Sequence, residues 1–169
     1  MRGRAERIGQ DERSGVTEEM SAVAIIGVGA SGVAAALLAR TKGAKVYVSD
    51  TRNDASAAAG ADRVRVVGAD VELGRHDVER IAGADTVVVS PGIPPDAPVL
   101  RALGARGVRW ISEPEFAFRF FQGQLIAVTG TNGKTTTAAL TAHLLREAGM
   151  DVALGGNIGA SLEIGRAHV

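Results

Sequence analysis

The chain has 169 residues, of which 46% are hydrophobic and 22% charged, and its 19 basic residues balance 19 acidic ones. This composition is typical of a globular protein, and a net charge of zero offers no basic surface for nucleic acid or anionic lipid. The sequence has no cysteine for a disulfide or a thiolate metal site, and no apolar run nears the roughly 18–20 residues that cross a bilayer. We therefore expect a cytoplasmic protein that binds neither nucleic acid nor membrane.

The first 19 residues are charged throughout and lack the apolar core of a signal peptide. They fit neither a strand nor an amphipathic helix, so residues 1–19 are expected to be a disordered or non-native extension. Met20 stands directly before the first predicted strand and is the expected true start.

From Ala22 onward, short β-branched runs alternate with Ala- and Leu-rich stretches of helical spacing, as in α/β proteins with a parallel sheet. The predicted strands are Ala22–Ile26, Lys45–Ser49, Val64–Val67, Thr86–Ser90, Val108–Ile111, Leu125–Thr129 and Val152–Leu154. The predicted helices are Ser31–Thr41, Ala97–Arg106, Glu113–Phe121 and Lys134–Ala148. Five strands precede Gly123, so a Rossmann-like domain is expected at residues 20–122, with a new unit after it.

The first predicted strand runs into GVGASG at residues 27–32, a G-x-G-x-x-G sequence that opens a helix. Gly27 permits the tight turn, Gly29 lets a phosphate approach the backbone, and Gly32 lets helix and strand pack closely. The helix N-terminus favours a diphosphate, and Asp50 would accept hydrogen bonds from a ribose hydroxyl or a base N–H. Alone this pattern predicts NAD, but a UDP-sugar presents the same pyrophosphate and ribose, and physical reasoning does not separate the two.

A second candidate loop, SPGI at residues 90–93, follows the strand predicted at Thr86–Ser90. Open α/β sheets bind ligands at the C-terminal ends of their strands, which makes Ser90 and Gly92 candidates for ligand contact. The alternative is a connection stiffened by proline.

The strand predicted at Leu125–Thr129 leads into GTNGKTT at residues 130–136 and then into a helix, which is the context of a P-loop. Backbone N–H groups of such a loop cradle phosphates, Lys134 would contact the β/γ-phosphates, and the Thr135 hydroxyl would ligate Mg²⁺. Two residues, Thr131 and Asn132, separate the glycines, where the general pattern has four.

The sequence TGTNGKTTT resembles the ATP loop of the Mur ligase family, which forms amide bonds in peptidoglycan precursors. The first glycine loop, SDTR at residues 49–52, SPGI, and GGNIG at residues 155–159 carry the same resemblance. It covers about residues 20–163 and is strongest toward the D-glutamate-adding ligases, since the L-alanine-adding ones usually carry His at the position of Asn132.

This resemblance implies a UDP-sugar in the first domain in place of NAD, and ATP with Mg²⁺ at the second loop. The implied UDP-sugar contacts are Gly29, Ala30, Ser31, Asp50, Thr51, Arg52, Ser90, Gly92 and Asn157. The implied ATP contacts are Gly130, Thr131, Asn132, Gly133, Lys134, Thr135 and Thr136. Lys134 and Thr135 would be the catalytic groups, and Thr135 also the metal ligand.

The resemblance further implies that ATP phosphorylates the carboxylate of UDP-N-acetylmuramoyl-L-alanine and that the amine of D-glutamate then displaces phosphate. Later metal ligands, a modified lysine and a third domain of the family are absent, so we expect an inactive fragment of an enzyme that is monomeric at full length. The alternatives are an L-alanine-adding ligase that acts on UDP-N-acetylmuramate, a non-catalytic module that binds NAD or a UDP-sugar, and an NAD-dependent dehydrogenase.

The sequence follows the family through about Leu162 and then departs. The final IGRAHV can be encoded by the start of a common sequencing adapter. Residues 123–163 are therefore expected to begin a truncated central ATP-binding domain, and residues 164–169 to be a non-native tail. His76, His143 and Glu147 match no motif and are interpreted as ordinary surface or core residues.

Overall fold

The computed structural model describes residues 21–155, and its first part is built on one parallel sheet. The strands are β1 (Ala22–Ile26), β2 (Lys45–Asp50), β3 (Asp70–Leu73), β4 (Thr86–Val89) and β5 (Ile111–Ser112). They pair in parallel in the order β3-β2-β1-β4-β5, which confirms the predicted Rossmann-like domain. The strand order reverses between β1 and β4, and ligands of open α/β sheets bind at such a switch point.

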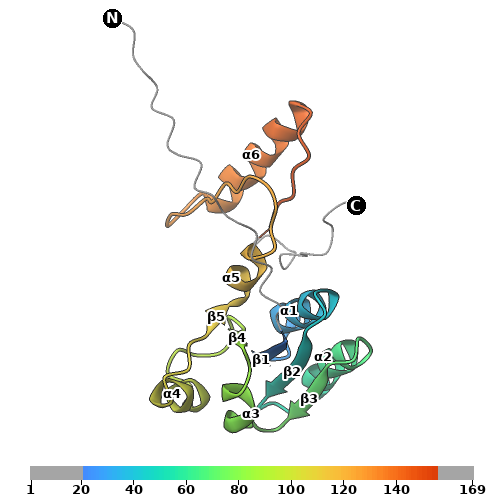
Figure 1. Ribbon diagram of the computed structural model, residues 1–169. Coiled ribbons are helices and arrows are strands. Elements are labelled where there is room, and N and C mark those ends of the chain that lie inside the picture. Colours follow the sequence, from blue (N-terminus) through green and yellow to red (C-terminus); the bar gives the residue numbers. More distant parts are fainter. Residues whose placement is uncertain (1–20, 156–169) are drawn as a thin grey trace, which may run out of the picture.

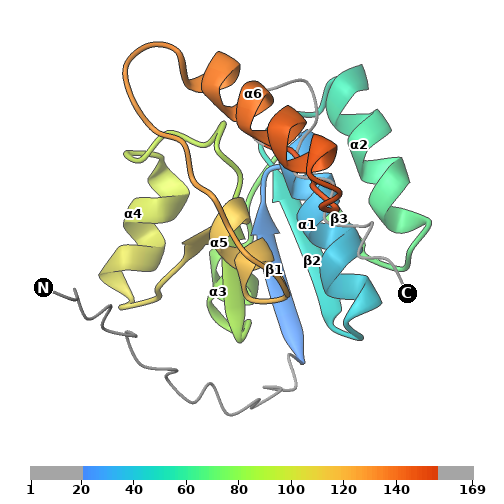
Figure 2. The same cartoon turned by 90° about the horizontal axis from the view of Figure 1, so that it is seen from above.

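Helices cover both faces of this sheet (Figure 1). They are α1 (Ala30–Thr41), α2 (Ala55–Arg65), α3 (Val78–Ala82), α4 (Pro98–Ala105) and α5 (Glu113–Phe118), and α6 (Lys134–Glu147) follows outside the sheet. Side chains of α1, α2 and α5 pack on one face, and those of α3 and α4 on the other. Figure 2 shows α2 and α4 at opposite ends of the row of strands.

The continuously apolar strands supply both layers of the core. In β1, Val23 and Ile25 face the layer of α1, while Ala24 and Ile26 face α3 and α4, and all four are buried. This is the pattern expected of parallel strands covered on both faces.

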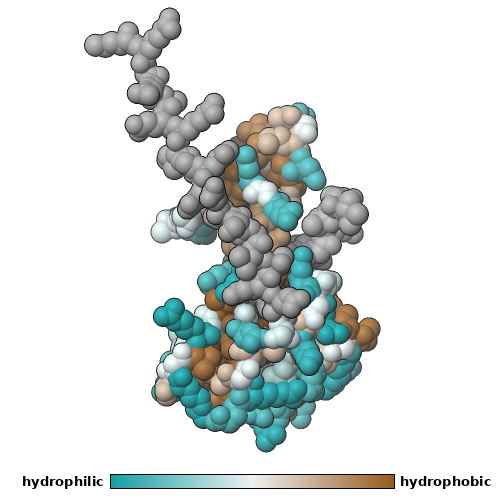
Figure 3. All heavy atoms as spheres, in the orientation of Figure 1, coloured by the Kyte–Doolittle hydropathy of each residue, from teal (hydrophilic) through white to brown (hydrophobic). Residues whose placement is uncertain are grey.

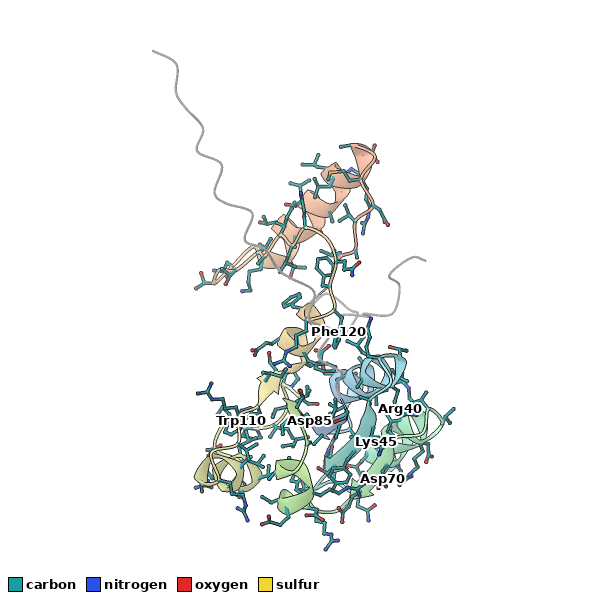
Figure 4. The ribbon with its side chains drawn as sticks, viewed as in Figure 1. Arg40, Lys45, Asp70, Asp85, Trp110 and Phe120 are labelled. Atoms are coloured by element: carbon teal, nitrogen blue, oxygen red, sulfur yellow. The ribbon has the colours of Figure 1, made fainter. Side chains whose placement is uncertain are left out.

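Polar and aromatic contacts fasten the end of α1 to its surroundings. Arg40, labelled in Figure 4, donates from Nε to the Val67 carbonyl at 2.8 Å and from Nη1 to the Ala44 carbonyl at 2.7 Å. Lys42 lies over the ring of Phe120, with its Nζ 5.2 Å from the ring centroid. The bond from Arg40 to Val67 joins α1 to the chain before β3. The contact of Lys42 with Phe120 joins the end of α1 to the residues after α5.

The strand predicted at Val64–Val67 is wrong, because these residues complete α2 and the turn after it. The Asp54 carboxylate caps α2 by accepting from the Ala57 N–H at 2.8 Å. Gly60 packs so closely on the glycine loop that a Cβ there would lie 2.3 Å from the Val28 carbonyl oxygen. The third strand is instead DVEL at Asp70–Leu73, an edge strand with acidic residues at alternate positions. Helices α2 and α3 were not predicted.

The strands predicted at Leu125–Thr129 and Val152–Leu154 are also wrong within the part of the chain that the structure describes. A strand must pair its backbone N–H and C=O groups, and no described strand lies beside either segment. Leu125 and Ile126 are 57% and 60% exposed. Figure 1 shows α6 standing apart from the sheet, and brown apolar atoms cover much of this region in Figure 3. Within residues 21–155, no helix has the length and apolar character to cross a membrane.

Gly32→Ala should lower the free energy of unfolding by about 3 kcal/mol, because the new Cβ would lie 1.9 Å from the Gly27 carbonyl oxygen. Urea unfolding followed by circular dichroism measures this loss. The matched control Gly29→Ala meets no atom within 4 Å and should cost less than about 1 kcal/mol. Equal losses in the two variants would contradict the close packing at Gly32.

Candidate functional site

The C-terminal edge of the sheet brings the candidate residues of the first domain together. The ladder pairs Ile26 with both Ser49 and Val89. The next residue on each strand is therefore in one row across this edge: Asp50 on β2, Gly27 after β1 and Ser90 after β4. The loops that follow Gly27 and Ser90 begin at the switch point of the sheet, and the loop after Asp50 begins on the neighbouring strand.

The glycine loop after β1 presents backbone that is open to a ligand. Gly27 has φ 101°, and Gly29 is the N-cap of α1 with no side-chain cap. The N–H groups in the first turn of a helix have no intrahelical partner, so those of Ala30 and Ser31 are available to an anion. A Cβ at Gly29 or at Gly92 would meet no atom within 4 Å, which leaves room for a ligand at both positions.

The side chain of Ser90 packs against the glycine loop at Gly27. It is 7% exposed, and its hydroxyl donates to the Gly27 carbonyl at 3.4 Å. A Cβ on Gly27 would lie 2.9 Å from that of Ser90, so the pair tolerates no larger residue at position 27. The burial of Ser90 favours a supporting role, whereas Gly92 lies in the open part of the same loop.

The carboxylate of Asp50 is fully engaged by the protein itself. Oδ1 accepts from the Arg52 N–H at 2.9 Å and from its Nε at 3.1 Å, while Oδ2 accepts from the Val28 N–H at 2.9 Å and from Arg52 Nη2 at 2.8 Å. An ionised carboxylate has about four acceptor positions, and these four bonds fill them. Asp50 therefore has no lone pair free for the ribose or the base in this arrangement.

The same contacts determine the charge of Asp50 and the position of Arg52. Burial alone would raise the pKa of Asp50, but hydrogen bonds from the Arg52 guanidinium and from the backbone N–H groups of Val28 and Arg52 bring this pKa down to about 2. The Arg52 side chain is 49% exposed, so its guanidinium is held by Asp50 while still facing solvent. Thr51 and Arg52 are the exposed residues here that can meet a ligand.

A polar cluster that includes His76 adjoins this edge on β2 and β3, and the sequence interpretation of His76 as an ordinary residue did not reveal it. The hydroxyl of Ser49, which is fully buried, lies 2.9 Å from His76 Nδ1. The Tyr47 hydroxyl donates to Glu72 at 2.6 Å, and burial together with that carboxylate raises the pKa of Tyr47 to about 12. Spacing gave no signal for this cluster, because the loop that carries His76 is distant from Ser49 in sequence.

The second glycine loop turns sharply at two glycines with positive φ and then opens α6. Gly130 has φ 147°, and Gly133 has φ 76° and is the N-cap of α6 without a side-chain cap. The Lys134 ammonium folds back and donates to the carbonyls of Gly130 and Thr131. This brings Gly130 through Lys134 into one compact turn, with Thr135 and Thr136 following in the first turn of α6.

The predicted site extends beyond the residues that the structure describes. Asn157 falls outside the described residues, as do residues 1–19 and 164–169 and the proposed start at Met20. Among the described residues, no three His, Cys, Asp or Glu side chains gather as a metal site. A divalent cation at Thr135 would therefore take its other ligands from the phosphates of a bound nucleotide and from groups outside such a cluster.

The fold and the two loops define a class of protein: a Rossmann-like domain followed by a second unit that also opens with a glycine loop and a helix. Residues 21–112 match the family described as Mur ligase MurD-like, N-terminal domain, and residues 128–167 match the Mur ligase middle domain. The chain belongs to the Mur ligase family, as its motifs predict.

Curated relatives carry the name UDP-N-acetylmuramoylalanine--D-glutamate ligase. One from Desulfatibacillum aliphaticivorans is 44% identical over 140 residues, which is 83% of this chain and 31% of the relative. Another from Bacteroides fragilis is 44% identical over 149 residues, covering 86% and 32%. The chain thus spans about a third of the length of these relatives.

Solved structures of ligases share the fold. A murein peptide ligase from Psychrobacter arcticus aligns with a TM-score of 0.54 and 30% identity, over 78% of this chain and 27% of that one. The UDP-N-acetylmuramate:L-alanyl-gamma-D-glutamyl-meso-diaminopimelate ligase from Neisseria meningitides aligns with a TM-score of 0.53 and 26% identity, over 84% and 46%.

The Asp50 clasp should make stability depend on pH in a predictable direction. The folded pKa of about 2 lies below the ordinary 3.8, so Asp50 contributes about 2 kcal/mol of stability above about pH 5. This contribution is lost as the pH falls from about 4 toward 2. Urea unfolding of the wild type and of Asp50→Asn should differ by that amount at pH 7 and converge near pH 2.

The matched control is Asp62→Asn, whose carboxylate pairs with Arg65 at the surface and is 73% exposed. Exposed ion pairs contribute little, so this variant should stay within about 0.5 kcal/mol of the wild type at pH 7. A gap between wild type and Asp50→Asn that is constant across the pH range would contradict the clasp.

Proposed function

We propose that this chain is the N-terminal part of an ATP-dependent ligase that adds D-glutamate to UDP-N-acetylmuramoyl-L-alanine. Residues 20–122 would hold the UDP part of that substrate, and residues 130–136 would hold ATP. The observation that carries the proposal is the presence of two glycine loops, each opening a helix without a side-chain cap, in one chain whose 44% identical relatives are named for that reaction.

The first loop suits a group that is bound but not transformed. Its free N–H groups at Ala30 and Ser31 would accept the diphosphate, and the open positions at Gly29 and Gly92 would let it approach. Thr51 and Arg52 would meet the uracil and ribose, with Asp50 holding Arg52 in place. Asn157 would reach the substrate from the second unit.

The second loop suits a phosphoryl group that is transferred. Gly130–Gly133 would cradle the phosphates of ATP, and Lys134 would place a charge on the oxygens that gain negative charge as the γ-phosphoryl moves. The substrate carboxylate attacks that phosphorus, the bond to ADP breaks, and the acyl phosphate that results loses phosphate when the amine of D-glutamate attacks its carbon. The Thr135 hydroxyl would hold Mg²⁺, which neutralises phosphate charge when bound.

The alternatives fit the site less well. NAD-binding domains of this fold use the acid after β2 to bind the ribose, and all four acceptor positions of Asp50 are filled. A simple binding module has no use for Lys134 in a phosphate nest. Asn132 favours the D-glutamate-adding ligases over the L-alanine-adding ones, as the family motif implies. The reaction would take place in the cytoplasm, by an enzyme that is monomeric at full length.

Titration calorimetry of the 169-residue chain tests the first domain directly. UDP-N-acetylmuramoyl-L-alanine should bind, and NAD should bind more weakly, because Asp50 would have to give up a contact with Arg52 to accept from its ribose. Binding of NAD without binding of the UDP-sugar would overturn the assignment.

The second loop is tested in an enzyme completed with the remaining domains of a full-length relative. Lys134→Ala should lower D-glutamate-dependent phosphate release by about 10²-fold or more, since one preorganised charge is removed from the transferring phosphoryl group. Lys45→Ala is the matched control, because Lys45 begins β2 (Figure 4). It therefore lies at the N-terminal edge of the sheet, and the candidate ligand-binding loops follow the C-terminal edge. Near-normal turnover of Lys134→Ala would show that the loop does not act on ATP.

A further inference from the structure

The aromatic residue Phe120 lies where the chain leaves the first domain, and Figure 4 labels it beside α1. It follows α5 and packs against the same core cluster as the buried side chains of α1. Its N–H donates to the Ala117 carbonyl at 3.0 Å, which continues the turn at the end of α5. Because Phe116 of α5 is fully buried, this turn is anchored to the core of the first domain.

Two neighbours from different helices hold the ring of Phe120. The ring of Phe116 meets it edge to face, with the centroids 5.4 Å apart and the planes at 75°. The Lys42 ammonium, at the end of α1, lies 5.2 Å from the centroid of the Phe120 ring. Edge-to-face aromatic pairs and a cation within about 6 Å of a ring centroid are both favourable arrangements. The ring therefore ties the end of α5 to α1, the helix that the first glycine loop opens.

The segment after Phe121 is held much less firmly. Within the described part of the chain, residues 122–129 make no backbone hydrogen bond. Gly123 has φ 149°, a conformation that residues with a side chain rarely adopt. No side chain of α6 belongs to either core cluster of the first domain. Among residues 21–155, the direction in which the chain leaves Phe120 therefore decides where the second glycine loop lies relative to the first.

We propose that Phe120 is a positioning residue, which, held by Phe116 and Lys42, fixes the second glycine loop relative to the first domain. This inference rests on the proposed function, in which the first domain holds the substrate whose carboxylate reacts and the second loop holds ATP. Reactants gain much of their rate from being held in the right geometry, and a displacement of about 1 Å can cost about 10²-fold. Phe120 acts through the placement of the two loops and not through contact with either ligand.

Energy transfer within the 169-residue chain measures this placement without any reaction. The chain has one tryptophan, Trp110 in the first domain, and no cysteine, so His143→Cys on α6 can carry a single dye that accepts energy from Trp110. In this labelled background, time-resolved energy transfer should give a narrow distribution of distances. Phe120→Ala should broaden it, and Phe120→Tyr, which keeps the ring, should not. The matched control Phe118→Ala removes a 43% exposed phenylalanine of α5 and should leave the distribution narrow.

Turnover tests the consequence in an enzyme completed with the remaining domains of a full-length relative. Phe120→Ala should lower kcat for D-glutamate-dependent phosphate release about tenfold or more, because the two reactants are no longer held in register. KM for ATP should stay within about twofold of the wild type, since the proposed ATP contacts lie within the second loop. Phe120→Tyr should restore kcat, and Phe118→Ala should not change it.

The outcomes separate this inference from the proposed function. Distance distributions of equal width with and without Phe120→Ala overturn the role of Phe120, as does a loss of kcat that Phe118→Ala shares. If Phe120→Ala does not fold, Lys42→Met decides, because it removes the charge over the ring and leaves Phe120 in place. A distribution for Lys42→Met as narrow as that of the labelled background then overturns the proposal. A completed wild type that releases no phosphate with D-glutamate overturns the proposed function, whereas energy transfer tests the placement independently of it.

Discussion

The buried carboxylate of Asp50 holds the ligand-facing edge of this domain together. Its oxygens fix the glycine loop through Val28 and the β2–α2 loop through Arg52, and its backbone carbonyl fixes the β3–α3 loop through Gly74. A buried charge is costly unless it is hydrogen-bonded and paired, and here both conditions are met by residues of the same edge. Three loops from three strands therefore owe their relative positions to one residue.

Features encoded locally could be predicted from the sequence. The strand Ala22–Ile26, the glycine loop after it and the helix beginning at Lys134 follow from apolar runs, glycine spacing and helix-opening residues that lie next to one another. The strand predicted at Val64–Val67 failed because an apolar run can also end a helix, and the contact of Gly60 with Val28 that favours the helix joins distant parts of the chain. The segment at Leu125–Thr129 failed because a strand exists only where a neighbour pairs with it.

Some features of the candidate site could likewise be predicted from the sequence, and others could not. Glycine spacing predicted both loops that open helices, and Asp50 was correctly placed at the end of β2. Its occupation by Arg52 and the approach of His76 to Ser49 could not be found, because both depend on how side chains turn after the sheet has formed. Sequence spacing locates a residue on an edge of the sheet but does not say which of its hydrogen-bonding positions the protein has already used.

The two glycine loops differ in the groups with which each would hold phosphate. In the proposed function the first would hold its anion with backbone N–H groups alone, and it packs closely against Ser90 and Gly32. Such a site suits a diphosphate that only has to be anchored. The second would add the charge of Lys134 to its backbone N–H groups, as a phosphoryl group in transfer requires.

The folded-back position of Lys134 has a consequence for which anions the second loop retains. Its ammonium is already solvated by the carbonyls of Gly130 and Thr131, so an incoming phosphate must displace those contacts before it gains the charge. Free orthophosphate offers few compensating contacts, whereas a triphosphate also fills the backbone nest. In the proposed function, the two carbonyls would compete with phosphate for the lysine, and this competition would weaken the binding of small anions relative to nucleotides.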